Sequence, residues 1–180
     1  ITGDPSSFYP PKMTGQTDGQ TSSVCLETLF RFDAKYNLLP LLATDWKADA
    51  NAKTITITLR QGVKFQDGSD FNAEVCKWNL DQYKTGTRPE LKKVASVDVV
   101  DEYTIKLNLS EFDNTVVTNL ANGSDAGRMI SEKSFDANGG IDWAAKNPVG
   151  TGPFIFVRQT KDVGVNWKRF DGYWGGKPNL

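Results

Sequence analysis

The stretch NPVGTGPFIF, Asn147 to Phe156, places two prolines and two glycines directly before an apolar run. Proline fixes the backbone φ angle, whereas glycine permits backbone angles and close approaches that a side chain would block. The alternating Phe154 and Phe156 then indicate a strand with one apolar face. The stretch therefore predicts a rigid turn immediately before a strand, and it raises the question of what that turn packs against.

Hairpins account for most of the expected strands. The clearest strand is KTITITLR (53–60), in which isoleucine and leucine alternate with threonine, and ATDWKAD (43–49) is its expected partner. A second hairpin is predicted within KVASVDVVDEYTIKLNL (93–109) and a third within FIFVRQTKDVGVNWKRF (154–170). The phenylalanines and the tryptophan of the third hairpin are expected in the core rather than in a ligand site.

Helices are expected between these hairpins. The first twenty residues are rich in Gly, Pro, Ser, Thr and Asp and predict an extended segment with turns. The loop NGSDAGR (122–128) is polar and glycine-rich, so we expect it at the surface or at the edge of a cleft. Capping residues and apolar spacing predict four helices, over 22–32, 71–83 with Asn72 as the N-cap, 114–120 and 131–140. Hairpins interspersed with helices indicate the mixed α/β, or α+β, class.

The composition excludes several classes of function. The chain has 180 residues and a net charge of −1, with no basic stripe of the kind that binds nucleic acid. Its apolar runs are shorter than the roughly 20 residues that a membrane-spanning helix needs. It has no histidine, which excludes Ser–His and Cys–His nucleophiles, and its acidic residues lie mostly in turns. We therefore expect neither an enzyme nor a metal or cofactor site.

Three residues have more than one interpretation from the sequence alone. Cys25 and Cys76 can be buried free thiols or can pair, and pairing across about 50 residues would stabilise the chain by roughly 4 kcal/mol. Arg128 lies in a polar, glycine-rich stretch. Its guanidinium is suited to a carboxylate or phosphate ligand, and the alternative is a solvated surface arginine.

Three motifs in order resemble the family 5 extracellular solute-binding proteins, the oligopeptide, dipeptide and nickel receptors of ABC importers. The first is LATDWKADANAKTITITLRQGVKFQDGSDFNAEVCKWNLDQY (42–83), the second is NPVGTGPFIF and the third is FDGYWGGKPNL (170–180). One departure is FQDG at 65–68, where the family more usually has an aromatic residue, histidine, aspartate and glycine. We expect that departure to have little consequence.

The resemblance implies a class II lobe like those of periplasmic binding proteins, with a mixed sheet and an inserted, hairpin-rich subdomain. In this interpretation residues 1–40 begin the first lobe, 41–147 form the insertion, 148–180 return to the first lobe, and the second lobe is absent. The turn at Pro148 to Pro153 would then fix where the chain re-enters the main sheet, near the wall of a ligand cleft.

The resemblance also implies candidate ligand contacts. Thr14, Gly15 and Gln16 lie in a segment that resembles the loop bordering the ligand, and Arg128 resembles a basic residue that binds a ligand carboxylate. Asn122 and Ser124 would lie nearby on the cleft lip, and Thr151 is a further candidate in a mainly structural motif. Cys25 and Cys76 are not part of the family's pattern; our own hypothesis is that the two helices expected to carry them pack together and that the cysteines form a disulfide.

The expected function is non-catalytic capture of a peptide or small solute for a membrane ABC permease. The resemblance implies a periplasmic or extracellular location, with or without a lipid anchor at the cell surface. The alternative is an interaction module, in which the open face of the lobe binds a protein partner or a second copy of itself.

Overall fold

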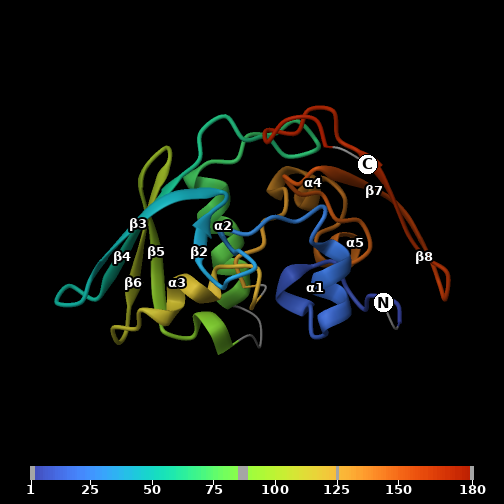
Figure 1. The fold of residues 1–180 in the computed structure, drawn as a ribbon. Helices are drawn as coiled ribbons and strands as arrows, with labels where there is room; N and C mark the ends of the chain where they lie inside the picture. Colours follow the sequence, from blue (N-terminus) through green and yellow to red (C-terminus); the bar gives the residue numbers. More distant parts are fainter. Residues whose placement is uncertain (1–2, 85–88, 125, 179–180) are drawn as a thin grey trace.

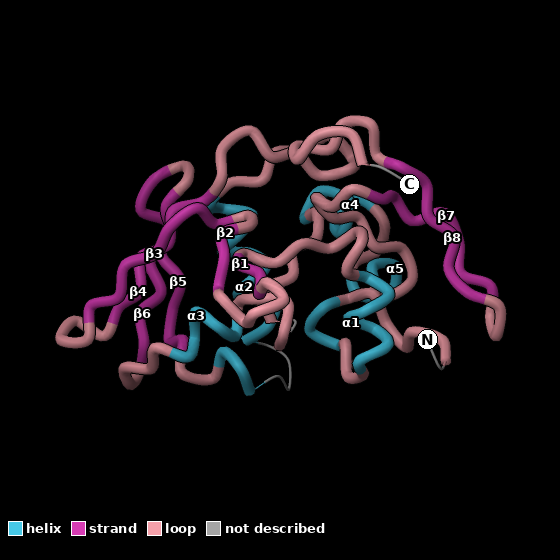
Figure 2. Tube along the Cα trace, viewed as in Figure 1, coloured by secondary structure: helices cyan, strands magenta, loops and turns pink. Residues whose placement is uncertain are grey.

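The computed structural model describes residues 3–84, 89–124 and 126–178 (Figure 1). The elements form two groups, with a four-stranded sheet on the left of the view and α1, α4, α5 and the β7–β8 hairpin on the right (Figure 1). Loops cross between the two groups at the top of the same view (Figure 2). No helix in the described part of the chain is long and apolar enough to span a membrane.

The four-stranded sheet has the order β3-β4-β6-β5, and each neighbouring pair is antiparallel. The alternation in β4 has its expected result, because Ile55, Ile57 and Leu59 are buried on one face. Both hairpins predicted in this region are confirmed. The bounds of the strands are β3 Ala43–Asp49, β4 Thr54–Leu59, β5 Val94–Asp101 and β6 Thr104–Leu109.

Helix α2 (Ala73–Lys84) packs on β5 and β6 and closes the main hydrophobic cluster. Its start is fixed as expected, since the side chain of Asn72 accepts a hydrogen bond of 3.1 Å from the backbone N–H of Val75. Cys76, Leu80 and Tyr83 are buried on the face turned to the sheet. The short helix α3 (Thr115–Asn119) and the 3₁₀ turn η2 (Pro89–Leu91) pack together beside it.

A second, smaller cluster contains residues from distant parts of the chain, including Tyr9, Met13, Leu26 and Ile130. It is covered by the helices α4 (Glu132–Ala137) and α5 (Ile141–Ala144), so the helix predicted before Gly140 is confirmed. The hairpin of β7 (Phe154–Thr160) and β8 (Gly164–Arg169) is also confirmed, and Trp167 packs on this cluster.

The two hydrophobic clusters do not follow the expected division of the chain into residues 1–40, 41–147 and 148–180. Residues 132–144, expected within the 41–147 insertion, pack with Tyr9 and Met13 in the second cluster. The mixed sheet is also not observed, because the described strands pair only antiparallel, and the one parallel bridge joins Phe30 to Ala121. The fold is nevertheless of the expected mixed α/β class. The expected boundaries at 40 and 147 remain a prediction.

The helix predicted over 22–32 was wrong, and the extended start predicted for the first twenty residues holds only up to Gly15, apart from one 3₁₀ turn. Helix α1 spans Gln16–Ser22, begins where Asp18 accepts hydrogen bonds from the N–H groups of Thr14 and Gly15, and is followed by the short strand β1 (Phe30–Phe32). The next strand is β2 (Leu38–Pro40), and the 3₁₀ turn η1 (Pro10–Lys12) precedes α1.

The backbone of residues 24–29 pairs with other segments instead of with itself. The carbonyl groups of Val24 and Cys25 accept hydrogen bonds from the N–H groups of Phe154 and Gly152, and that of Glu27 accepts one from Met129. These long-range partners replace the local hydrogen bonds of a helix, so tertiary structure overrides the apolar spacing.

The two cysteines are free and buried, which corrects the expected disulfide. Cys76 lies on α2 in the main cluster, whereas Cys25 lies in the second cluster on a segment that is not a helix. The Cys25 thiol contacts the Gln66 side chain at 3.4 Å and the Pro148 carbonyl at 3.6 Å. Burial raises the pKa of the Cys25 thiol to about 12 and also raises that of Cys76, so neither is a reactive thiolate at neutral pH.

Candidate functional site

The turn at Val149–Pro153 packs against the backbone of residues 24–26. A Cβ atom at Gly150 would lie 2.1 Å from the Cys25 carbonyl oxygen, and one at Gly152 would lie 2.7 Å from the same atom. The N–H group of Gly152 donates a 2.9 Å hydrogen bond to this oxygen. Glycine is therefore required twice in the motif because two backbones meet there without space for a side chain.

Gln66 joins this turn to the strand that follows it. Its side-chain amide donates to the carbonyl groups of Gly152 at 2.9 Å and Phe154 at 2.8 Å, and its own N–H group donates to Gly150. The departure from the family pattern at this position therefore has a structural role, contrary to our expectation. An amide side chain can donate two hydrogen bonds from one nitrogen, as this site requires.

A buried carboxylate, Glu27, connects the NPVGTGPFIF motif with the FDGYWGGKPNL motif. Its oxygens accept hydrogen bonds from the Thr151 hydroxyl at 2.8 Å, the Tyr173 hydroxyl at 2.7 Å and the Trp174 indole at 2.8 Å. The guanidinium of Arg60 stacks over the Trp174 ring, 4.6 Å from its centroid. Burial raises the pKa of Glu27, while the three hydrogen bonds act in the opposite direction.

Thr151 is fully buried, and its hydroxyl is committed to Glu27. It does not line the pocket described below, so the structure does not support the expected ligand contact. The expectation that the NPVGTGPFIF motif is mainly structural agrees with this geometry. Glu27 itself was missed, and the available signal was a single carboxylate within the apolar run VCLETLF.

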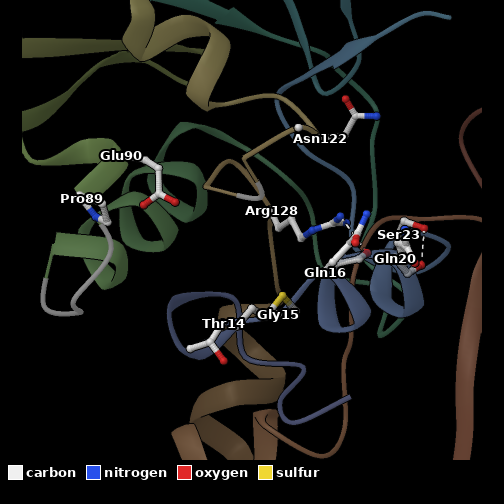
Figure 3. Close-up of a pocket in the computed structure, with 12 residues that line it drawn as sticks. Thr14, Gly15, Gln16, Gln20, Ser23, Pro89, Glu90, Asn122 and Arg128 are labelled. Atoms are coloured by element: carbon white, nitrogen blue, oxygen red, sulfur yellow. Dashed lines mark hydrogen bonds between the residues drawn. The ribbon is translucent and has the colours of Figure 1, made fainter. Parts of the chain in front are cut away.

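A pocket of about 680 Å³, lined largely by polar side chains, lies beside α1 (Figure 3). Five of the residues expected at the ligand site line it: Thr14, Gly15, Gln16, Asn122 and Arg128. Gln20, Ser23 and Glu90 also line it and were not predicted. Gln20 and Ser23 are on or next to α1, so locating α1 correctly would have indicated them.

Arg128 lies at the back of this pocket and is only 3% exposed. Its guanidinium nitrogens donate to the carbonyl groups of Leu26 at 2.7 Å and Gly19 at 2.9 Å. Residues 126–128 are buried, so this part of the predicted surface loop belongs to the interior. Arg128 thus connects α1 to the segment after it, and the alternative of a solvated surface arginine was wrong, whereas the ligand contact remains a prediction.

The other expected residues differ in their surroundings. The exposed Asn122 accepts a 2.9 Å hydrogen bond from the Phe32 N–H group, which fixes its side chain at the pocket rim. Ser124 donates to the Asn119 carbonyl and does not line the pocket. The structure therefore does not place Ser124 with the other candidates.

Asp67 is a second carboxylate with a dense set of donors. Ser131, Ser134 and Ser69 donate hydroxyl hydrogen bonds to it, and the Ser69 N–H group donates another. Burial alone would raise its pKa, but these hydrogen bonds prevail and lower the pKa to about 2. The cluster connects the FQDG turn to the start of α4.

The described residues contain no group of three or more His, Cys, Asp or Glu side chains able to hold a metal ion. The site thus consists of a polar pocket on a lobe whose three sequence motifs are connected by buried hydrogen bonds. This combination fits the solute-binding class that the three motifs resemble.

The chain belongs to the bacterial extracellular solute-binding proteins, family 5, whose model matches residues 37–180. It is 30% identical to the dipeptide-binding protein of Escherichia coli K12, in an alignment that covers 99% of this chain and 38% of that protein. It is 36% identical to the glutathione-binding protein GsiB of Salmonella typhi, covering 84% of this chain and 30% of GsiB. The chain therefore spans about a third of the length of these relatives.

The fold is shared with solved structures of the same family. The periplasmic binding protein DppA of Helicobacter pylori, solved in complex with the peptide STSA, superposes with a TM-score of 0.82 at 26% identity. That superposition covers 97% of this chain and 39% of DppA. The likeness confirms the class II architecture expected from the motifs.

Proposed function

We propose that this chain is the first lobe of a substrate-binding component of an ABC importer, and that it contributes half of a site for a peptide or small solute. The observation that carries the proposal is the pocket beside α1, which brings together Thr14, Gly15 and Gln16 from the start of α1 and the loop before it, and Asn122 from a separate loop. These residues offer hydroxyl, amide and backbone groups for a polar solute. The peptide bound to the DppA neighbour and the named ligands of the two relatives support the class of solute.

In this proposal the partner is a membrane ABC permease, and the location is periplasmic or extracellular, with or without a lipid anchor. The work of the protein is a population shift between open and closed states, driven by solute contacts to both lobes. No catalytic step is involved.

The proposal is tested by titrating the ¹⁵N-labelled 180-residue chain with di- and tripeptides and with glutathione. We expect shifts confined to backbone amides near the pocket, such as those of Thr14, Gly15 and Gln16, with weak affinity because half a cleft buries only half of a ligand. Absence of shifts at these amides would contradict solute capture at this site. Micromolar affinity measured by calorimetry would contradict the assignment of half a site.

A second candidate function is an interaction module that binds a protein or a second copy of the chain. The observation that favours it is the exposed apolar surface of the β7–β8 hairpin, where Val163 is 82% exposed and Val157 is 51% exposed. Light scattering without solute distinguishes this function, because self-association makes the apparent size rise with protein concentration.

A further inference from the structure

The dipeptide Asn-Gly occurs twice in the sequence, at Asn122–Gly123 and at Asn138–Gly139. In this dipeptide the glycine nitrogen can attack the side-chain amide carbon of the asparagine, because glycine has no side chain to obstruct ring closure. Both asparagines are exposed to solvent, so exposure does not distinguish them. Their hydrogen bonds do distinguish them.

Asn122 and Gly123 are the central residues of a turn at the rim of the pocket. Across this turn the Ser124 N–H group donates a 3.3 Å hydrogen bond to the Ala121 carbonyl group. The Gly123 N–H group lies inside the turn and donates to no residue that the structure describes. The nitrogen that would attack is therefore not held by a backbone or side-chain acceptor in the described parts of the chain.

The side-chain amide of Asn122 is polarised at its oxygen. Oδ1 accepts a 2.9 Å hydrogen bond from the Phe32 N–H group. Negative charge develops on this oxygen when a nitrogen attacks the amide carbon, and an N–H group already directed at the oxygen stabilises that charge as an oxyanion hole does. The amide nitrogen, which is the leaving group, has no acceptor among the described residues, and the amide stands apart from the Arg128 guanidinium (Figure 3).

The amide of Asn138 has the opposite arrangement. Its Nδ2 atom donates a 2.9 Å hydrogen bond to the Ser134 carbonyl group in α4. This hydrogen bond must break before the nitrogen can leave, and no described residue donates to Oδ1 of Asn138. The fold therefore protects Asn138 and activates Asn122.

We propose that Asn122 is a site of spontaneous deamidation. The Gly123 nitrogen bonds to Cγ of Asn122, the Cγ–Nδ2 bond breaks, and the glycine proton leaves with the amide nitrogen as ammonia. Water then opens the cyclic imide at one carbonyl group to give aspartate or at the other to give isoaspartate, so no oxidant, reductant or enzyme is required. Either product adds one negative charge to the pocket rim, and the modification does not depend on the proposed function.

The inference is tested by incubating the folded 180-residue chain in mildly alkaline buffer made with ¹⁸O-enriched water, followed by proteolysis and mass spectrometry. We expect ¹⁸O to enter the Asn122 peptide at least about fivefold faster than the Asn138 peptide, the factor that one ordinary hydrogen bond is worth in a rate. In concentrated urea the two peptides should react at equal rates, because the hydrogen bonds that distinguish them are lost. Both rates should rise with pH, since the glycine nitrogen attacks only after losing its proton.

The variant Gly123→Ala is the matched control. A Cβ atom at this position would meet only the Phe32 ring, at 3.4 Å, so the variant should fold. Its methyl group crowds the attacking nitrogen, so product at Asn122 should fall to a small fraction while product at Asn138 stays unchanged. If the variant does not fold, the comparison of folded and urea-unfolded unmodified chain decides the question alone.

Three results would overturn the inference. They are absence of product at Asn122 in the folded chain, reaction at Asn138 that is as fast or faster, and a ratio of the two rates that is the same in urea as in the folded chain. The third result would assign the reactivity to the dipeptide alone and not to the Phe32 hydrogen bond. Each of them leaves the proposed function intact, because solute titration does not depend on this reaction.

Discussion

Replacement of Glu27 by alanine should destabilise the chain more than any change at the polar surface. The change leaves the Thr151 hydroxyl, which is fully buried, without its acceptor, and removes the acceptor of the Tyr173 and Trp174 donors. An unsatisfied buried hydroxyl costs about 1–3 kcal/mol, and each partly exposed donor adds about 0.5–1.5 kcal/mol. Relief of carboxylate burial offsets part of this sum, so we expect a loss of about 2–4 kcal/mol in the free energy of unfolding.

Glu27→Gln should cost less, about 1 kcal/mol, because the amide keeps two of the three hydrogen bonds. Thr151 and Trp174 both donate to the same carboxylate oxygen, so the amide oxygen should take that place. The amide nitrogen then faces the Tyr173 hydroxyl, which can turn and accept.

The assay is urea unfolding monitored by tryptophan fluorescence. The NMR signal of the Trp174 indole N–H group serves as a local probe of the site. A double-mutant cycle between Glu27→Ala and Thr151→Val should give a coupling energy of about 0.5–3 kcal/mol, as for residues in contact. A Glu27→Ala variant within about 0.5 kcal/mol of the unmodified chain, or a coupling energy of zero, would refute the reasoning.

The direction in which the stability contributed by Glu27 changes with pH follows from its raised pKa. The folded-state pKa of Glu27 is raised above its ordinary value of 4.5, so the folded state binds the proton more tightly than the unfolded state. Stability from this group is therefore greatest below pH 4.5 and falls as the pH rises through the folded-state pKa. The stability difference between the unmodified chain and Glu27→Gln should narrow over the same interval, and a widening difference would contradict the assigned direction.

Three further outcomes are expected. Gly150→Ala should lose at least about 1–3 kcal/mol through overpacking against the Cys25 carbonyl, whereas Gly123→Ala, whose Cβ would meet Phe32 at 3.4 Å, should lose much less in the same urea assay. The pH dependence at Asp67 has the opposite sign to that at Glu27, because the pKa of Asp67 is lowered from 3.8 to about 2. The stability that Asp67 contributes should be complete above pH 4 and should be lost as the pH falls from 3.8 to about 2. In Asp67→Asn, the urea midpoint should therefore change less with pH in this acidic range. Cys25 and Cys76 should resist alkylation in the folded chain and react fully in denaturant, and a mass gain of two hydrogens on reduction would show a disulfide instead.

Local patterns predicted the elements whose partners are close in sequence. The isoleucines of β4 and the Asn72 cap of α2 were correctly interpreted because a period of two and an N-cap are set within a few residues. Residues 22–32 failed for the opposite reason. Their apolar spacing fits a helix, but their backbone groups bind Gly152 and Phe154, more than 120 positions away.

The candidate site was predicted only in part for a related reason. Thr14, Gly15 and Asn122 lie in exposed loops and Gln16 is the exposed first residue of α1, where polar composition is a usable signal. Burial distinguishes Arg128 and Thr151 from them, and burial depends on contacts that no local pattern contains. Glu90 comes to the pocket only through the packing of η2 on α3.

The contacts of Glu27 also define how far the polypeptide can be shortened for biochemical work. A version cut before Tyr173 would leave the buried Glu27 side chain with only the Thr151 hydroxyl as a donor. Versions that keep the YWGG tetrapeptide should therefore yield more soluble material than versions ten residues shorter, even though the tetrapeptide lies outside the helices and strands of the described residues.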